Sequence, residues 1–141
     1  MKTIRSFLIA LLLMAPLFAQ ADIAVIVNSS NPVRSMSSPE VADLYLGRTR
    51  TYGSGEYALV FDQGRDSPLR SRFFSALTGM TLQQVNSYWS RLMFTGQVLP
   101  PQPLPDDRAV LEIVRRNPGA IGYVPAHIVD SSVRVVLTLK E

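Results

Sequence analysis

The chain has 141 residues, no cysteine, and 14 basic against 11 acidic side chains. Its length suits one domain built around one hydrophobic core. The lack of cysteine excludes disulfides, thiolate metal sites and a lipid-bearing cysteine.

The first 21 residues have the pattern of a cleaved secretory signal. Two basic residues precede a 12-residue apolar stretch, Phe7–Phe18, which is followed by Ala19-Gln20-Ala21. A membrane span needs about 20 apolar residues, so a retained membrane helix is the less favoured alternative. We predict cleavage between Ala21 and Asp22 and a periplasmic location. The mature chain would carry 12 basic and 11 acidic residues, and this net charge of +1 argues against nucleic-acid binding.

Strands and helices are predicted to alternate along the mature chain. Residues 23–27 form a continuous apolar run, which is typical of a buried parallel strand. An N-cap at Ser38 followed by Pro39 predicts a short helix that ends at Gly47. A second strand is predicted at residues 58–61.

The helix that follows this strand is predicted to begin after Ser67 and to end at Gly79. Its predicted buried face consists of Leu69, Phe73 and Leu77. This spacing places Arg70 at the margin of the buried face.

The second half of the chain continues the alternation. Thr81 begins a capping box and a helix, whereas the four prolines of residues 99–105 predict a crossing loop without regular structure. The next helix is predicted to begin at Asp106 and Asp107. Strands at 120–124 and 133–137 complete a pattern that predicts an α/β sandwich whose mainly parallel sheet is flanked by helices.

Residues 61–73, FDQGRDSPLRSRF, are the strongest candidate for a binding site. They lead from the end of an apolar strand into a helix, and the first amides of a helix, together with its dipole, favour oxyanions. Ser67 is the predicted N-cap, and Leu69 and Arg70 are predicted to present free amides.

The helix start at Ser38-Pro39 provides an internal comparison. There the next residue is Glu40, which would repel an anion, whereas the helix after Ser67 begins without an acid. We therefore select Ser67 and Arg70 as candidate ligands, followed by Arg65. A capped helix with solvated arginines is the alternative.

Evidence for catalysis is weak. The single histidine, His127, has no Cys or Glu at ligand spacing, and no serine stands out as a nucleophile. We expect no enzymatic activity, no cofactor and no metal. Tyr88 and Trp89 could form an aromatic platform, but their helical spacing favours a core position for Trp89. Arg48 and Arg50 are interpreted as residues of a surface loop.

Three segments of the chain resemble the phosphate-binding periplasmic proteins of ABC transporters. They are residues 23–33 (IAVIVNSSNPV), 41–48 (VADLYLGR) and 117–124 (NPGAIGYV), of which the last is the most specific. The resemblance covers nearly all of the mature chain but only one of the family's two lobes, the second in chain order. It predicts a single-lobe, type 2 periplasmic-binding-protein-like domain over residues 22–141.

The resemblance also places the family's oxyanion loop at residues 65–69. That loop resembles Asp-Gly-Ser-Gly-Thr with an arginine nearby, whereas this sequence reads Arg65-Asp66-Ser67-Pro68-Leu69. Ser67 is in register, Pro68 removes an amide, and Leu69 has no hydroxyl. Arg65 and Asp66 could act as the loop's charged residues in a shifted register.

These features predict a periplasmic protein that binds phosphate or a related oxyanion weakly, in phosphate ABC transport. A charge-assisted hydrogen bond contributes about 1.5–3 kcal/mol, whereas micromolar affinity requires about 8 kcal/mol. A second copy of the chain or another protein would have to supply the rest of a tight site. The expected partners are a membrane transporter or sensor. The alternative function is a non-catalytic interaction module that docks on a membrane sensor or another envelope protein.

Overall fold

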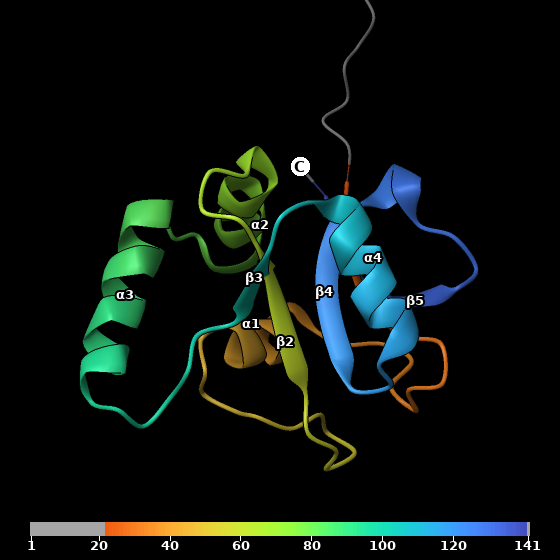
Figure 1. The fold of residues 1–141 in the computed structure, drawn as a ribbon, viewed down its shortest axis with the longest axis horizontal. Coiled ribbons are helices and arrows are strands. Elements are labelled where there is room, and N and C mark those ends of the chain that lie inside the picture. Colours follow the sequence, from red (N-terminus) through yellow and green to blue (C-terminus); the bar gives the residue numbers. More distant parts are fainter. Residues whose placement is uncertain (1–21, 141) are drawn as a thin grey trace, which may run out of the picture.

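The computed structural model describes residues 22–140, so the predicted signal sequence lies outside the described residues. In chain order the elements are β1 (Ile23–Asn28), α1 (Ser38–Tyr45), β2 (Leu59–Gln63), α2 (Pro68–Thr78), α3 (Leu82–Phe94), β3 (Gln102–Leu104), α4 (Asp107–Arg116), β4 (Ala120–Pro125), the short 3-10 helix η1 (Ala126–Ile128) and β5 (Val133–Leu139) (Figure 1). No helix within this part of the chain combines the length and the apolar character needed to cross a bilayer.

The strands form one sheet in the order β3-β2-β4-β1-β5. β2 is parallel to β3 and β4, whereas β1 is antiparallel to β4 and β5. Four strands therefore share one direction, which confirms the predicted α/β sandwich with a mainly parallel sheet. The interpretation of residues 23–27 as a parallel strand is wrong. β1 is an interior strand between β4 and β5 and is buried on both faces, and its uniform apolar composition reflects that burial and not its direction.

Helices cover both faces of the sheet, and β1 shows how the two layers divide. Ile23, Val25 and Val27 belong to the core cluster that packs against α1, α2 and α3. Ala24 and Ile26 point the other way, into the cluster formed with α4. In Figure 1, α3 stands at the margin of the molecule beyond α2, away from the sheet.

The proline-rich segment contains a short strand that its composition did not predict. β3 pairs with β2 in a register that places Pro103 opposite Asp62. Because proline has no N–H, Pro103 cannot donate a ladder bond to β2. Proline is tolerated here because β3 is an edge strand, and it leaves that edge fewer donors for pairing with another chain.

The predicted helix starts are confirmed at three of four positions. Ser67, Thr81 and Asp106 are N-caps whose side chains accept from the third helical amide. The N-cap of α1 is Ser37 and not Ser38, and its hydroxyl accepts from the Glu40 amide at 3.3 Å. This shift makes Pro39 the second helical residue, a position where the missing N–H costs nothing.

Candidate anion-binding site

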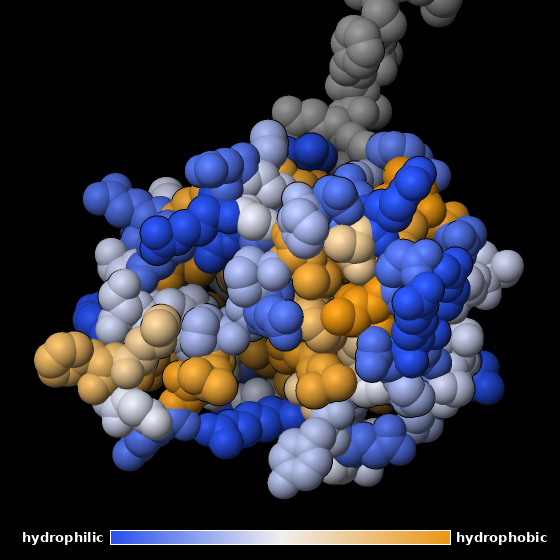
Figure 2. Space-filling model, viewed as in Figure 1, coloured by the Kyte–Doolittle hydropathy of each residue, from blue (hydrophilic) through white to orange (hydrophobic). Residues whose placement is uncertain are grey.

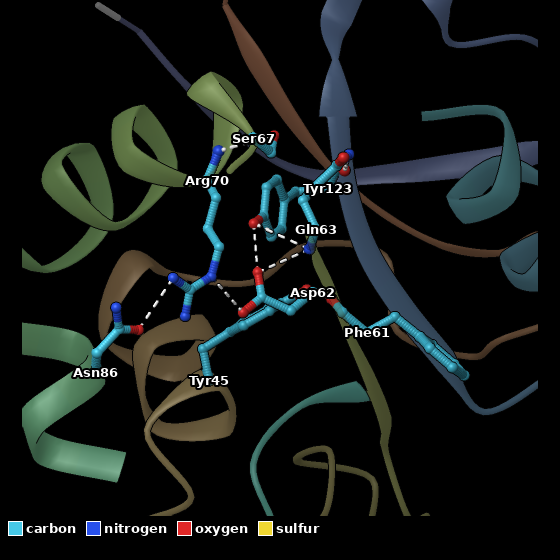
Figure 3. Close-up of polar contacts among 8 residues, drawn as sticks. All are labelled: Tyr45, Phe61, Asp62, Gln63, Ser67, Arg70, Asn86 and Tyr123. Atoms are coloured by element: carbon cyan, nitrogen blue, oxygen red, sulfur yellow. Dashed lines mark hydrogen bonds and ion pairs between the residues drawn. The ribbon is translucent and has the colours of Figure 1, made fainter. Parts of the chain in front are cut away.

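A buried ion pair connects the end of β2 to the first turn of α2. The Arg70 Nε atom lies 2.9 Å from Asp62 Oδ2, and both side chains are more than nine-tenths buried. The Arg70 Nη1 atom also donates to Asn86 Oδ1 of α3 at 3.2 Å (Figure 3). The guanidinium therefore holds strand and helices together. Its charge is already compensated by a carboxylate of the same chain.

The other oxygen of Asp62 is also fully engaged. Asp62 Oδ1 accepts from the Tyr123 hydroxyl and, at 2.8 Å, from the Gln63 amide. Burial raises the pKa of Tyr123, and the neighbouring Asp62 charge raises it further, so this hydroxyl remains a donor. Such complete pairing is what a buried carboxylate requires.

Aromatic rings form the floor beneath this ion pair. Phe73 stacks on Tyr123 with the ring centroids 3.7 Å apart and the planes 4° apart, and Tyr45 meets Phe73 edge to face. The Arg70 guanidinium lies 5.2 Å from the centroid of the Phe74 ring. Tyr45 donates to the Phe61 carbonyl at 2.8 Å. These contacts pack the buried ion pair against the aromatic part of the core.

The start of α2 offers fewer free donors than the sequence predicts. The Arg70 amide donates to both the carbonyl and the hydroxyl of Ser67, at 3.1 and 3.4 Å, so the expectation of a free amide at Arg70 is wrong. The Ser67 hydroxyl is used in this cap. Pro68 has no N–H, and the Leu69 side chain is buried in the core. Of the two amides that the sequence predicts to be free, at Leu69 and Arg70, the Ser67 cap uses that of Arg70.

A cavity of about 160 Å³ lies beside the ion pair, at the carboxyl end of β2. Its wall includes Arg65 and Arg70 and is completed by Asp62, Gln63, Asn86, Trp89, Ser90, Met93, Pro100, Pro101 and Pro103. Arg65 is exposed, and within residues 22–140 no ion pair joins it to a carboxylate. Ligands of open α/β folds bind at this edge of the sheet.

The cavity brings together residues from segments far apart in the chain. Gln63 donates through Nε2 to Asp107 of α4 at 2.7 Å, which fixes the end of β2. Asn86 and Trp89 come from α3, one turn apart. Trp89 is buried in the core as predicted, and its indole N–H has no partner among the described residues. This unpaired donor lies in a residue that lines the cavity.

Two of the five predicted ligand residues, Arg65 and Arg70, line the cavity, whereas Asp66, Ser67 and Leu69 do not. Asp66 is exposed on the loop before α2. The sequence reasoning missed Asp62, Gln63 and Asn86. Asp62 and Gln63 directly follow the apolar residues 58–61, and this pattern could have indicated them as site residues. Nothing local to α3 indicates that Asn86 faces them.

The remaining polar candidates lie elsewhere on the surface. His127 is exposed in η1. Arg48 pairs with Asp43 at 3.4 Å, and Arg50 donates to the Gln97 carbonyl, as expected for a surface loop. In the described range, no group of three or more His, Cys, Asp or Glu side chains is arranged to hold a metal ion.

No protein-family model matches the sequence, and comparison with curated proteins finds no match. Solved structures do match the fold. A candidate phosphate ABC transporter substrate-binding protein with bound phosphate from Clostridium perfringens aligns with a TM-score of 0.67 and 22% identity, covering 82% of this chain and 45% of that protein. An ABC-type phosphate transport receptor from Vibrio cholerae gives 0.66 and 19%, covering 84% and 47%.

A candidate phosphate-binding protein from Planctomyces limnophilus gives a TM-score of 0.58 at 14% identity, covering 75% of this chain and 37% of that protein. The chain therefore shares its fold with a part of each of these three proteins, in line with the fold that the three sequence segments indicated. It spans less than half the length of each of these proteins.

Proposed function

We propose that the chain is a solute-binding-like protein of the bacterial periplasm that recognises phosphate or a related oxyanion weakly, at the cavity beside Arg65 and Arg70. The observation that carries this proposal is the cavity itself, which lies at the carboxyl end of β2 and includes an unpaired arginine. The fold shared with phosphate-binding proteins supports the same ligand class.

The charge of the cavity favours an anion. Asp62 and Arg70 neutralise each other, so the charge of Arg65 is the uncompensated one in the lining. Asn86 accepts through its carbonyl oxygen, which leaves its amide nitrogen available to donate. An oxyanion would therefore meet one free cation and a neutral donor.

The small number of free hydrogen-bond donors in the cavity predicts weak binding. One charge-assisted hydrogen bond contributes about 1.5–3 kcal/mol and each neutral one about 0.5–1.5 kcal/mol. Association costs reduce this sum. A total near 4 kcal/mol corresponds to a Kd of about 1 mM. Tight capture in a phosphate ABC transport system would need a second surface, from another copy of this chain or from another protein.

Calorimetry on the purified protein tests the proposal with phosphate, sulfate and acetate at millimolar concentrations. We expect binding heat with phosphate or sulfate and its loss in Arg65→Ala. Arg116→Ala, which removes an exposed arginine on α4, should bind like the wild type and is the matched control. The absence of heat with all three anions would refute the proposal, as would equal binding by Arg65→Ala.

A second candidate function is a non-catalytic interaction module that docks on an envelope partner. The observation in its favour is an exposed apolar face at the opposite end of β2, where Tyr57 and Leu99 are 77% and 87% exposed. One chain could perform both functions, because the lining of the anion cavity and that of this face share only Pro100 and Pro101.

A further inference from the structure

A groove of about 620 Å³ opens at the beginning of β2, at the other end of the strand from the anion cavity. Its walls come from the end of α1, the loop before β2, the first residues of β2 and the loop between α3 and β3. The groove and the anion cavity share only Pro100 and Pro101. The groove is therefore a separate site.

The groove is lined by side chains that a folded protein normally buries. Tyr57, Leu59 and Leu99 line it, and each is at least half exposed. At the end of α3, Met93, which lines the anion cavity, and Phe94 are exposed as well, at 52% and 95%. Figure 2 shows hydrophobic side chains gathered between the lower end of α3 and the lower part of β2. Exposed apolar patches of this kind mark interaction sites.

The charges around the groove select the kind of partner. Arg50 is the only charged residue of the lining, and its guanidinium is positioned by the Gln97 carbonyl. A second copy of the chain docking groove to groove would present another Arg50 and no acidic lining residue to pair with it, which disfavours a symmetric dimer. An acidic partner is favoured instead.

The composition of the lining favours a protein over an anionic membrane. It combines tyrosine, arginine, leucine and proline and contains no lysine, aspartate or glutamate, which is the pattern of protein interface cores. Recognition of anionic lipid relies on clusters of basic residues, and one arginine does not provide such a cluster.

We propose that this groove binds a segment of a partner protein that places apolar side chains against Leu59 and Leu99 and a carboxylate against Arg50. The interaction goes beyond the proposed anion binding because it uses another surface and another ligand class, and it rests on the second candidate function, whose partner it specifies. Tyr57 and Arg50 belong to the residue types that dominate binding energy at protein interfaces.

Peptide selection tests this proposal. The purified protein is the target, and the peptides come from a displayed library of random dodecapeptides. We expect enriched peptides that combine aromatic or aliphatic residues with Asp or Glu. A synthetic copy of an enriched peptide should bind to Leu59→Asp and to Arg50→Glu at least about tenfold more weakly than to the wild-type protein. Replacing the peptide's acid with lysine should restore binding to Arg50→Glu. Val135→Asp, which alters an exposed apolar side chain on β5, is the matched control.

Several results would overturn the proposal. They are the absence of any enriched peptide, a basic consensus, or enriched peptides that bind Leu59→Asp and Arg50→Glu as tightly as the wild type. Sedimentation that reveals a dimer, dissociated by Leu59→Asp, would assign the groove to a second copy instead. Should Leu59→Asp fail to fold, the surface variant Arg50→Glu and its charge-swapped peptide still decide the question.

Discussion

Arg70 and Asp62 form an ion pair with Nε and Oδ2 only 2.9 Å apart, and both side chains are almost completely removed from solvent. The pair joins the end of strand β2 to the first turn of α2. Arg70 is therefore a structural residue first, and it contributes to the anion cavity as part of the wall. The free positive charge of that cavity belongs to Arg65.

Removing the charge of Asp62 should strongly destabilise the protein. Asp62→Asn would leave the Arg70 guanidinium buried without a countercharge, and breaking such a pair lowers the free energy of unfolding by about 3–5 kcal/mol. Urea denaturation of the variant and the wild type measures the loss. Asp43→Asn breaks the half-exposed pair with Arg48 and should cost less than about 1 kcal/mol. Equal losses in the two variants would show that the buried pair has no special role.

The buried tyrosines predict a loss of stability in alkali. Burial and the nearby Asp62 charge raise the pKa of Tyr45 and Tyr123 above the ordinary value of 10.0. Above pH 10 the unfolded chain loses these protons while the folded chain keeps them, so stability is complete below that pH and falls above it. Each tyrosine should lower the free energy of unfolding by about 1.4 kcal/mol per pH unit.

Urea denaturation between pH 9 and pH 11, with tyrosinate absorbance recorded in parallel, checks this prediction. The Tyr45→Phe variant should show a shallower fall with pH than the wild type. Tyrosinate signals from Tyr45 and Tyr123 should develop together with unfolding. A Tyr45→Phe variant with the same pH slope as the wild type would contradict the assignment.

Gly47 should tolerate substitution much less well than Gly79. Both glycines have positive φ, +69° and +72°, so alanine is strained at each. A Cβ at Gly47 would lie 2.8 Å from Trp89 and from Val98, whereas a Cβ at Gly79 would meet nothing within 4 Å. Overpacking of this kind adds about 1–3 kcal/mol. Thermal unfolding of Gly47→Ala and Gly79→Ala measures the difference, and equal unfolding midpoints would contradict the predicted crowding.

The parts of the fold that depend on local pattern could be predicted from the sequence. Apolar runs located the strands that begin at Ile23, Ala120 and Val133, and polar caps located helix starts at Thr81 and Asp106. These features depend on neighbouring residues alone. The direction of β1 could not be predicted, because strand direction follows from which strands pair, and burial looks the same in either case.

The site was predicted less completely because its decisive contacts are not local. Helical spacing places Arg70 at the margin of the buried face, but its burial depends on Asp62, eight residues earlier, and on Asn86 of another helix. The cap at Ser67 was predicted, although its consequence for the Arg70 amide was not. The strand β3 could not be predicted, because prolines are tolerated in a strand only at the edge of a sheet, and the sequence does not reveal which strand lies at the edge.

The most direct test of weak anion recognition beside Arg65 is a phosphate titration followed by NMR. Trp89 is the single tryptophan of the chain, so its indole N–H gives one assignable resonance from the cavity wall. We expect that resonance to shift with a Kd of about 1 mM and the shift to disappear in Arg65→Ala. An indole resonance that phosphate does not move, in a folded wild-type protein, would contradict the proposed site.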